Sequence, residues 1–389
     1  MSATPDLPDA APIPSQVLLL CWRDTGHPQG GGSELYLQRV GQRLAERGAT
    51  VTLLTAAYPG APAVEIRDGV RIVRAGGRLS VYPRALATIV AGRFGRGPLA
   101  DFSPELVVDT QNGVPFFATV ASAAPTLVLV HHCHREQWPV AGPLLSRIGW
   151  FIESRLSPLV HRRSQYVTVS APSAAELVEL GVDAERVTVV RAGIDPLPVT
   201  PRPPSDDAVH LVTLSRLVPH KQIDHALEVI AQLRRSHPQI VLDIIGGGWW
   251  DDRLRTRATE LDVADRVTFH GHVTDERKHE LLSGAHLHLM PSQKEGWGIA
   301  VIEAAQHAVP TIGYRHAAGL RESIAHDETG FLVDSVDELV SATRKLVDDP
   351  ASARRLGDAA YQRAQDYSWE STTDGIIAAA GRATSRRLR

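Results

Sequence analysis

Two glutamates in the second half of the chain stand in a pattern that suits a polar, charged ligand. Glu295 lies in a glycine-containing loop directly after an apolar run, and Glu303 lies eight residues later in the helix expected from Ile299. Both carboxylates can face the carboxyl edge of one sheet, where the helix N-terminus adds N–H groups and a positive potential. Two glutamates alone are typical of an ordinary surface, but the flanking strands and the Gly-x-Gly within residues 291–314 favour a binding site.

A second charged motif follows another expected strand. Arg216 and Lys221 lie in "LSRLVPHKQID" over residues 214–224. A guanidinium binds oxygens as a fork and an ammonium acts as a point charge, so the two suit a diphosphate. A solvated basic loop would have the same composition, so this motif alone leaves both interpretations open.

Three glycines open the first expected helix, in "HPQGGGSELY" over residues 27–36. Without side chains, Gly31 and Gly32 would let a diphosphate or a sugar approach the main chain at a helix N-terminus. No G-K-[ST] follows them, so the turn is not a P-loop.

Another glycine-rich turn, "GGGWWDD" over residues 246–252, raises the question of a dinucleotide-binding fingerprint. The pattern G-x-G-x-x-G would need glycine where Asp251 stands, so a dehydrogenase is not favoured. Gly246 can still lie close to a nucleotide, and we expect Trp249 and Trp250 to pack.

Three histidines follow an apolar run in "VHHCHREQW", residues 130–138. His131 and His134 have a spacing that zinc could use, but no cluster of further ligands is evident, so we expect no metal. A histidine at the carboxyl end of a strand can instead hydrogen-bond a polar substrate. His131 ends the apolar run directly and is preferred over His132 for that role.

Length and composition are those of an ordinary globular protein. Its 389 residues suit two domains, with 43% hydrophobic and 22% charged residues. A formal net charge of −3 does not favour nucleic acid as a partner. Apolar runs are too short for a transmembrane helix, and the lead, residues 1–15, lacks the features of a signal peptide, so we expect a disordered lead and a cytoplasmic protein. The two cysteines, Cys21 and Cys133, are expected as buried thiols.

Strands alternate with helices along both halves of the chain, which predicts parallel, doubly wound sheets. Expected strands cover 16–22, 50–56, 106–110, 126–132, 166–171 and 187–193, and then 209–217, 241–248, 267–273, 287–292 and 309–314. Five prolines within 195–208 indicate a linker. We therefore expect an N-terminal domain over 16–194, a C-terminal domain over 209–367, and a last helix, 368–389, that crosses back to the N-terminal domain.

These motifs together resemble the retaining glycosyltransferases of family 4, the glycogen-synthase-like and mannosyltransferase-like group with the GT-B fold. The matching pieces are "GGSE", "SRLVPHK", "EGWGIAVIE", "TGFLVD" at 329–334 and "YSWE" at 367–370, in the expected order. In two departures, Gln222 stands where a glycine usually follows the lysine, and "GGGWW" replaces the commoner Gly-x-Gly-Pro. The resemblance implies an α/β fold of two Rossmann-like, doubly wound parallel-sheet domains that face a central cleft.

The resemblance also implies transfer of a hexose from a nucleotide diphosphate sugar to a hydroxyl of a glycolipid, polysaccharide or small glycoside. By position, Arg216 and Lys221 would hold the donor diphosphate, and Glu295 would face the hydroxyls of the donor sugar. Glu303 would hold the ribose, and His131 would contact the donor sugar near the reacting carbon. The catalytic candidates are His131, Glu295, Arg216 and Lys221. The donor-binding candidates are Gly31, Gly32, Arg216, Lys221, Gly246, Val273, Glu295, Gly296, Trp297, Gly298 and Glu303.

The expected chemistry uses neither cofactor nor metal, because the sequence contains no D-x-D tripeptide for a divalent ion. Cations and helix N–H groups would stabilise the departing diphosphate. The family further implies attack from the same face of the sugar, with the departing phosphate accepting the acceptor's proton. GDP-mannose, UDP-glucose and UDP-N-acetylglucosamine all stay open as donors. Alternatives are a sugar phosphorylase, an epimerase on the same fold, or a nucleotide-sugar-binding protein without transfer activity.

The stretch 135–166 combines several arginines with Trp138, Trp150 and Phe151. Such a basic, aromatic stretch can dock on the anionic inner face of a membrane, or it can be a solvated helix face over core aromatics. Peripheral membrane contact and the oligomeric state are both left open by the sequence.

Overall fold

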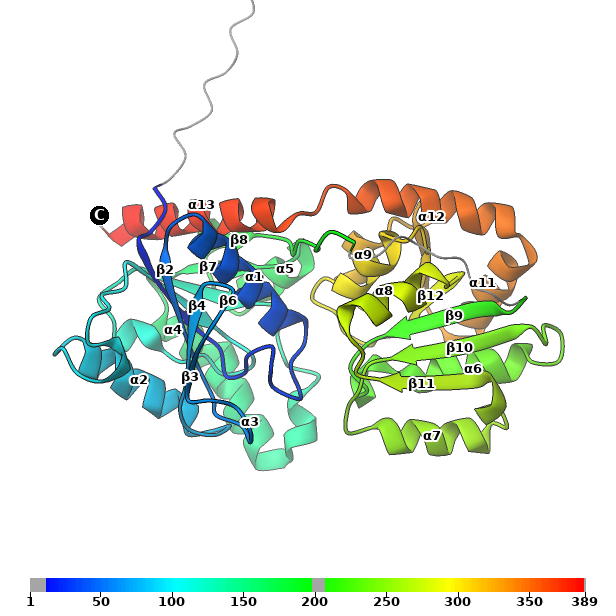
Figure 1. The fold of residues 1–389 in the computed structure, drawn as a ribbon, viewed down its shortest axis with the longest axis horizontal. Helices are drawn as coiled ribbons and strands as arrows, with labels where there is room; N and C mark the ends of the chain where they lie inside the picture. Colours follow the sequence, from blue (N-terminus) through cyan, green and yellow to red (C-terminus); the bar gives the residue numbers. More distant parts are fainter. Residues whose placement is uncertain (1–11, 198–206, 388–389) are drawn as a thin grey trace, which may run out of the picture. The chain divides into compact units, whose positions relative to one another are not determined.

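The computed structural model of the protein describes residues 12–197 and 207–387, which divide into two compact units (Figure 1). Unit 1 comprises the chain up to Gly193 together with the chain from Trp369, and unit 2 comprises Ile194–Ser368. Most of the expected linker, residues 198–206, lies outside the described residues. Among the helices that are described, none combines the length and the apolar character needed to cross a membrane.

Within its described residues, unit 1 holds an eight-stranded sheet in the order β3-β4-β2-β1-β5-β6-β7-β8. Every neighbouring pair is parallel except β3 and β4. The strands are β1 (Gln16–Leu20), β2 (Thr50–Thr55), β3 (Val64–Arg67), β4 (Val70–Arg74), β5 (Leu106–Thr110), β6 (Thr126–Val130), β7 (Gln165–Thr168) and β8 (Val187–Val189). The helices are α1 (Gly32–Glu46), α2 (Val81–Gly92), α3 (Pro143–Phe151), α4 (Ser157–Val160), α5 (Ala171–Glu179) and α13 (Trp369–Arg387), with a π-helical turn, η4 (Ile152–Leu156), between α3 and α4.

Unit 2 holds, in the part that is described, a six-stranded parallel sheet in the order β11-β10-β9-β12-β13-β14. The strands are β9 (Val209–Leu214), β10 (Ile240–Ile245), β11 (Val267–Gly271), β12 (Leu287–Met290), β13 (Thr311–Tyr314) and β14 (Gly330–Val333). The helices are α6 (Ile223–Leu233), α7 (Asp251–Glu260), α8 (Asp275–Ser283), α9 (Ile299–Ala305), α10 (Leu320–Ser323), α11 (Val336–Asp348) and α12 (Pro350–Ala364). The predicted class, two α/β units with parallel sheets, is confirmed.

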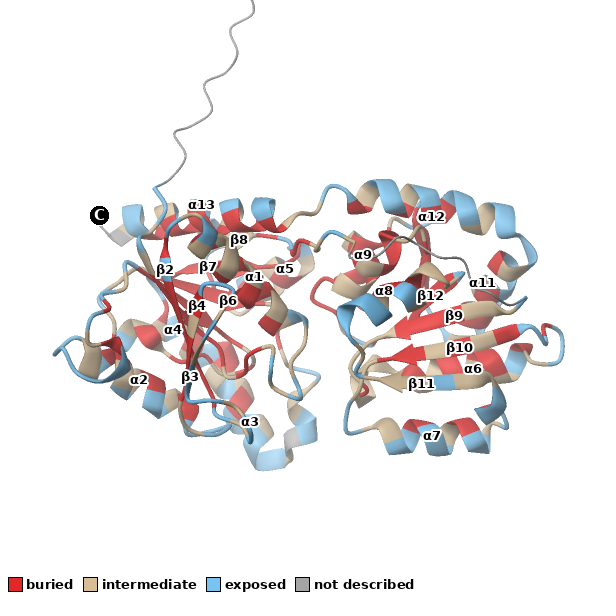
Figure 2. Ribbon diagram, viewed as in Figure 1, coloured by how far each residue is buried: buried red, intermediate tan, exposed pale blue. Residues whose placement is uncertain are grey.

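Continuous apolar runs form the central strands because helices cover both faces of these sheets. Four of the five residues of β1 are buried, as are all five of β5 and of β6. Figure 2 shows the same distribution, with buried residues on the strands and exposed residues on the outer faces of the helices. Both cysteines are buried, as predicted, and they form no disulfide.

The sequence reading missed the hairpin of β3 and β4. Its turn is Asp68-Gly69, with φ of 49° and 77°, the left-handed pair that a two-residue hairpin turn requires. β3 is an edge strand that alternates between exposed and half-buried residues, so it lacks the apolar run that marks a buried strand. The expected strands also omitted β14, although all four of its residues are buried.

The last helix, α13, belongs to unit 1. Trp369 at its start is 1% exposed, and its ring meets Tyr36 of α1 edge-on at 5.9 Å. The hydroxyl of Thr372 donates to the carbonyl oxygen of Arg191, 2.9 Å away. A buried tryptophan therefore anchors the end of the chain against the first helix.

The turn after β10 is glycine-rich because it lies against the main chain that follows β9. Gly246 has φ of 121°, and a Cβ placed on it would lie 2.0 Å from the carbonyl oxygen of Ser215. A Cβ on Gly248 would lie 2.2 Å from the carbonyl oxygen of Leu217. The expected strand over 241–248 therefore ends at Ile245. Trp250 packs on the core of unit 2, and Trp249, although 64% exposed, stacks on the ring of Trp250 at 5.6 Å.

We predict that Gly246→Ala lowers the free energy of unfolding by about 3 kcal/mol, because a methyl group there meets backbone in a left-handed conformation. Gly271→Ala is the matched control: φ is 65° but nothing lies within 4 Å of its Cβ position. That variant should lose only about 1 kcal/mol. Urea unfolding of both variants measures the difference, and equal losses would contradict the steric explanation.

Candidate functional site

The sharpest feature of unit 2 is an ion pair between two of the predicted site residues. Lys221 Nζ lies 2.5 Å from Glu295 Oε1, and the two side chains are only 14% and 10% exposed. Lys221 ends the short turn after β9, and Glu295 follows β12, the neighbouring strand. Parallel strands bring their carboxyl ends to the same edge, so residues 74 positions apart in the chain come into contact. This cation is thus held in place before any ligand arrives.

Gln222, one of the two departures from the family pattern, explains why a glycine is usual after that lysine. Its φ is 48° and its ψ is 41°, in the left-handed region that glycine adopts without steric cost. Here the residue precedes α6 directly. The backbone turn is therefore kept even though the glycine is not.

Arg216 is fixed through its main chain. The amide of Ser215 donates to Ile245 and the amide of Leu217 donates to Gly247, so both neighbours of Arg216 are tied to β10 and its glycine turn. Gly246 thus acts on the site indirectly, by allowing this close approach. Its own amide donates to the carbonyl oxygen of Gly271, 2.9 Å away, at the end of β11. Val273, two residues on, packs half-buried against a small apolar cluster.

The loop after Glu295 is tightly held. Trp297 is 3% exposed and meets the ring of Tyr367 edge-on at 5.3 Å. Gly298, with φ of 90°, leads into α9, which begins at Ile299 as predicted. A Cβ on Gly319 would lie 2.5 Å from the main chain of Gly296, so these two segments are in backbone contact.

Glu303 is paired with a lysine that the sequence analysis overlooked. Lys278 on α8 lies 2.7 Å from Glu303 Oε1 and 2.9 Å from Asp275 Oδ1. Burial opposes the charge of Lys278, but the two carboxylates outweigh it and raise its pKa above the ordinary value. Glu295 and Glu303 are thus paired with different lysines. In the sequence, Lys278 is only a basic residue near the start of a helix, and nothing there indicates that it pairs with Glu303.

In unit 1, the glycine loop is held by Glu34, which the sequence analysis quoted but gave no role. Glu34 is 2% exposed, and its Oε2 accepts the amide hydrogen of Gly31 at 2.9 Å. Its Oε1 accepts from Arg23 Nε, also at 2.9 Å. The expectation that the Gly31 amide is open to a ligand is therefore wrong. The reason is visible in the sequence as a glutamate three residues after a helix cap, a capping-box spacing.

Gly32 is the first residue of α1. The amide groups of a helix's first turn have no acceptor inside the helix, so Gly32 and Ser33 keep N–H groups that a ligand can use. Of the two glycines predicted to contact the donor, only Gly32 therefore keeps its amide hydrogen for a ligand.

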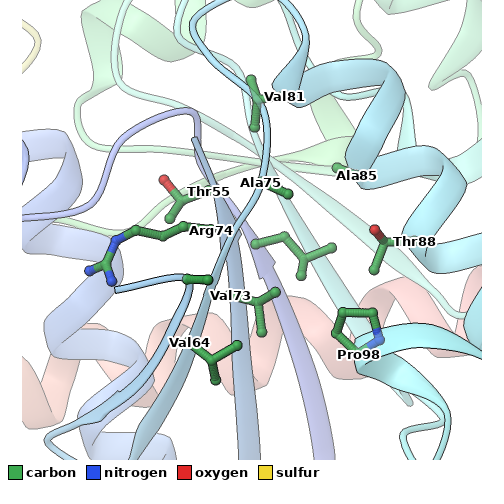
Figure 3. Close-up of a pocket in the computed structure, with 11 residues that line it drawn as sticks. Thr55, Val64, Val73, Arg74, Ala75, Val81, Ala85, Thr88 and Pro98 are labelled. Carbon is green, nitrogen blue, oxygen red and sulfur yellow. The ribbon is translucent and has the colours of Figure 1, made fainter. Parts of the chain in front are cut away.

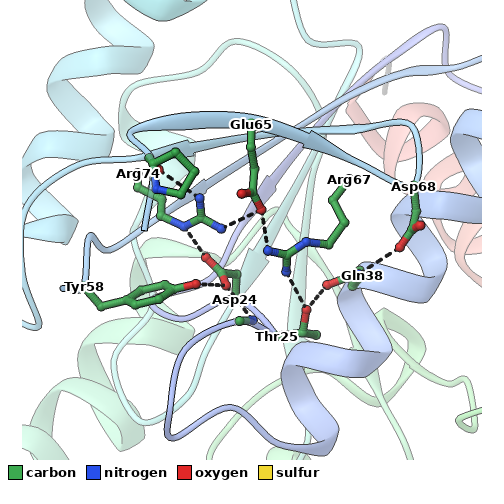
Figure 4. A network of polar contacts seen from close by, with 10 residues as sticks. Asp24, Thr25, Gln38, Tyr58, Glu65, Arg67, Asp68 and Arg74 are labelled. Carbon is green, nitrogen blue, oxygen red and sulfur yellow. Dashed lines mark hydrogen bonds and ion pairs between the residues drawn. The ribbon is translucent and has the colours of Figure 1, made fainter. Parts of the chain in front are cut away.

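A network of buried charges anchors the start of the same loop (Figure 4). Arg74 and Asp24 are both fully buried, with Nε and Oδ2 2.6 Å apart. Asp24 Oδ1 accepts the amide hydrogen of Gly26 at 2.7 Å and the hydroxyl hydrogen of Tyr58 at 3.2 Å. Burial opposes the charge of Arg74, but Glu65 and Asp24 raise its pKa. The loop between β1 and α1 is thus fixed at both ends by carboxylates.

His131 lies directly after β6, and its ring meets Tyr36 edge-on at 5.3 Å. Its Nε2 is buried and finds no hydrogen-bond partner in the described chain. Burial, with a smaller effect of His134, lowers the pKa of His131 from 6.5 to about 4. At neutral pH the ring is therefore uncharged, a hydrogen-bonding group and not a cation. His132 Nε2 instead lies 2.9 Å from Gln137 Nε2.

Clusters of three or more His, Cys, Asp or Glu side chains that could bind a metal ion are absent from the described residues. A cavity of about 150 Å³ lies between α2 and the ends of β2 and β4, lined by Leu54, Val73 and Val81 among others (Figure 3). Its walls are mainly apolar, so it does not suit a diphosphate.

Two family models match the chain, one for each half. The model described as "Glycosyltransferase Family 4" matches residues 30–196, and that described as "Glycosyl transferases group 1" matches residues 201–363. The matches include the loops of Gly32 and His131 in unit 1, and of Lys221, Glu295 and Glu303 in unit 2.

Individual proteins that are similar to this chain are also glycosyltransferases by name or share its fold. A GDP-mannose-dependent alpha-(1-6)-phosphatidylinositol monomannoside mannosyltransferase of Mycobacterium tuberculosis is 32% identical over 85% of this chain and 89% of its own length. A glycogen synthase of the same species is also 32% identical, but the match covers 55% of this chain and only 53% of that protein. The structure of sucrose-phosphate synthase from Thermosynechococcus elongatus superposes with a TM-score of 0.79, at 22% identity, over 96% of this chain and 99% of that one.

We predict that His131 makes the protein less stable in acid. Because its pKa falls from 6.5 to about 4 on folding, the unfolded chain alone binds this proton between those values. Stability is therefore fully present above pH 6.5 and falls as the pH drops toward 4. In His131→Phe, the loss of unfolding free energy between pH 7 and pH 4 should be smaller by about 2 kcal/mol. Urea titrations at both pH values test this, with the exposed His272→Phe as control; parallel losses in both variants would contradict it.

Proposed function

Because the chain belongs to the glycosyltransferases of family 4, we propose that it transfers a hexose from a nucleotide diphosphate sugar to an acceptor hydroxyl, with retention and without a metal ion. The observation that carries the proposal is the contact of Lys221 with Glu295 beside the fixed loop of Arg216. It combines a diphosphate-binding charge with a carboxylate that can accept hydrogen bonds from sugar hydroxyls, as a nucleotide sugar requires.

In the proposed reaction the bond between the anomeric carbon and the diphosphate oxygen breaks, and negative charge develops on that oxygen. Arg216 and Lys221 stabilise this charge without reorganising, because their loops are already fixed. Neutral His131 hydrogen-bonds the donor sugar near the reacting carbon, and Glu303 binds the ribose hydroxyls. The acceptor oxygen attacks from the face that the diphosphate leaves, and the departing phosphate oxygen takes the acceptor's proton.

The donor class follows from the relatives only in part. The mannosyltransferase is named as GDP-mannose-dependent. We propose GDP-mannose as the first donor to assay, with UDP-glucose and UDP-N-acetylglucosamine beside it. Binding of a nucleotide sugar without transfer, or its epimerisation, is the alternative, and product analysis with and without acceptor distinguishes the two.

We predict that transfer persists after exhaustive EDTA treatment, because Arg216 and Lys221 supply the charge that a divalent ion would supply. Lys221→Ala should lower kcat by about 10²-fold, the usual loss for one preorganised donor. Lys345→Ala, which removes an exposed lysine of α11, should keep full activity. Complete loss of turnover in EDTA, restored by Mg²⁺ or Mn²⁺, would reject the metal-independent mechanism.

We further propose that unit 1 contacts an anionic membrane at the inner face of the cytoplasmic membrane, where a glycolipid acceptor would lie. Helix α3 exposes a stripe of apolar side chains at helical spacing: Leu144 (70%), Leu145 (58%), Ile148 (47%) and Phe151 (58%). The alternative of the sequence analysis, in which the aromatic residues of this stretch lie in the core, is therefore wrong for Phe151. Figure 2 shows α3 as a largely exposed helix of unit 1.

The charges around this stripe match an anionic surface. Exposed arginines of the same stretch are Arg135, Arg147, Arg155, Arg162 and Arg163. Of its acidic residues, Glu136 is exposed, whereas Glu153 is buried. Apolar side chains that enter the headgroup region and arginines that bind lipid phosphates reinforce each other in such helices.

We predict that the protein co-sediments with vesicles containing phosphatidylglycerol at low salt, and less with vesicles of phosphatidylcholine alone. Phe151→Gln should weaken binding at least several-fold, because it removes an aromatic ring from the stripe. Phe94→Gln is the matched control, since Phe94 is 75% exposed outside the stripe. Equal binding by both variants, or no binding at low salt, would reject this surface.

A further inference from the structure

Glu153 is a buried carboxylate that the proposed reaction leaves without a role. Its side chain is fully buried, and it lies in η4, the π-helical turn between α3 and α4. A carboxylate without water is costly unless it is paired and hydrogen-bonded. Single π-turns within helices occur frequently at functional sites. Glu153 must therefore be hydrogen-bonded inside the protein, and its partners indicate its role.

Both oxygens of Glu153 bind one loop, residues 131–138, which follows β6. Oε1 accepts the amide hydrogen of His134 and lies 3.0 Å from the ring Nδ1 of the same residue. Oε2 accepts the indole hydrogen of Trp138 at 2.7 Å. A single side chain thus satisfies donors from two positions in the loop that carries His131.

The hydrogen bonds from Glu153 to the loop 131–138 are here called the clamp. The indole of Trp138, which is part of it, also packs against two further elements. A Cβ on Gly149 of α3 would lie 2.2 Å from the ring, and one on Gly113, in the loop after β5, would lie 2.9 Å from it. The ring therefore fills a space that exists only because both residues are glycines. The loop after β6 is fixed between the loop after β5 on one side and helix α3 on the other.

Glu153 also determines which nitrogen of His134 carries the hydrogen. An ionised carboxylate oxygen can only accept, so Nδ1 must donate to it. In the neutral ring, Nε2 then keeps a free lone pair. The rings of His134 and His132 lie 4.5 Å apart.

We propose that Glu153 is a positioning residue for sugar transfer: it fixes the loop 131–138 and so holds His131 in the orientation that meets the donor sugar. This inference rests on the proposed function. It adds a residue that lies 22 positions from His131 in sequence and belongs to none of the motifs. Glu153 acts through His134 and Trp138 and does not itself contact the substrate.

A positioning role makes a different prediction from a purely structural one. Glu153→Gln keeps the shape of the side chain but cannot accept all three hydrogen bonds at once. At least one buried donor, such as the Trp138 indole, then loses its acceptor, which lowers stability. The variant should therefore unfold at a somewhat lower temperature but stay folded under assay conditions, whereas small shifts of a catalytic group reduce turnover strongly.

The test compares kcat, donor KM and thermal unfolding for the wild type, Glu153→Gln and Trp138→Phe. We expect kcat of Glu153→Gln to fall by about 10- to 100-fold, with donor KM changed less than two-fold, because unit 2 carries the diphosphate-binding residues. Trp138→Phe loses one hydrogen bond and the part of the indole that packs on Gly149 and Gly113, so it should also lower kcat. Glu179→Gln, an exposed glutamate of α5, is the matched control.

A second measurement does not depend on activity. Nitrogen NMR of ¹⁵N-histidine-labelled protein should show His134 as the Nδ1–H tautomer in the wild type and a changed His134 signal in Glu153→Gln. If the wild type transfers sugar and Glu153→Gln keeps full kcat, the inference is overturned while the proposed function stands. If the loss of kcat in Glu153→Gln is no larger than the fraction of the variant that is unfolded at the assay temperature, the role is structural and the inference is also overturned. If the wild type does not transfer sugar at all, the proposed function fails, and an unchanged His134 signal in the variant would then reject the clamp as well.

Discussion

Buried carboxylates must be paired, because water no longer solvates them, and in this protein the pairs lie at the loops that follow parallel strands. Asp24, which follows β1, binds Arg74 at the end of β4. Glu295, which follows β12, binds Lys221, which follows β9. Each pair joins segments far apart in sequence at one edge of a sheet. The loops that carry the candidate site are therefore fixed within each unit before a ligand binds.

Such pairs are weak evidence for stability, because desolvation offsets much of their attraction. Their value lies in geometry. Glu34 takes the amide of Gly31 and leaves Gly32 and Ser33 at the open end of α1. Lys278 holds Glu303 as Lys221 holds Glu295, so each proposed sugar-binding carboxylate has its own cation. The site is thus built from separate charge pairs and not from two adjacent carboxylates.

Helix α3 and the π-turn after it connect two properties of unit 1. The outer side of α3 carries exposed Leu144 and Phe151, and its continuation carries buried Glu153. Gly149 between them lets the ring of Trp138 lie directly on the helix. One continuous helical segment therefore bears both the proposed membrane surface and the clamp on the histidine loop.

The sequence by itself determined the α/β class, the central strands and most candidate residues, because buried parallel strands are continuous apolar runs and family motifs are local. It also placed the start of α9 at Ile299. It did not find β3, β4, β14, Lys278 or Glu153, and it left the Gly31 amide open. β3 has no apolar run, and a charge shows its partner only once folding brings distant segments together.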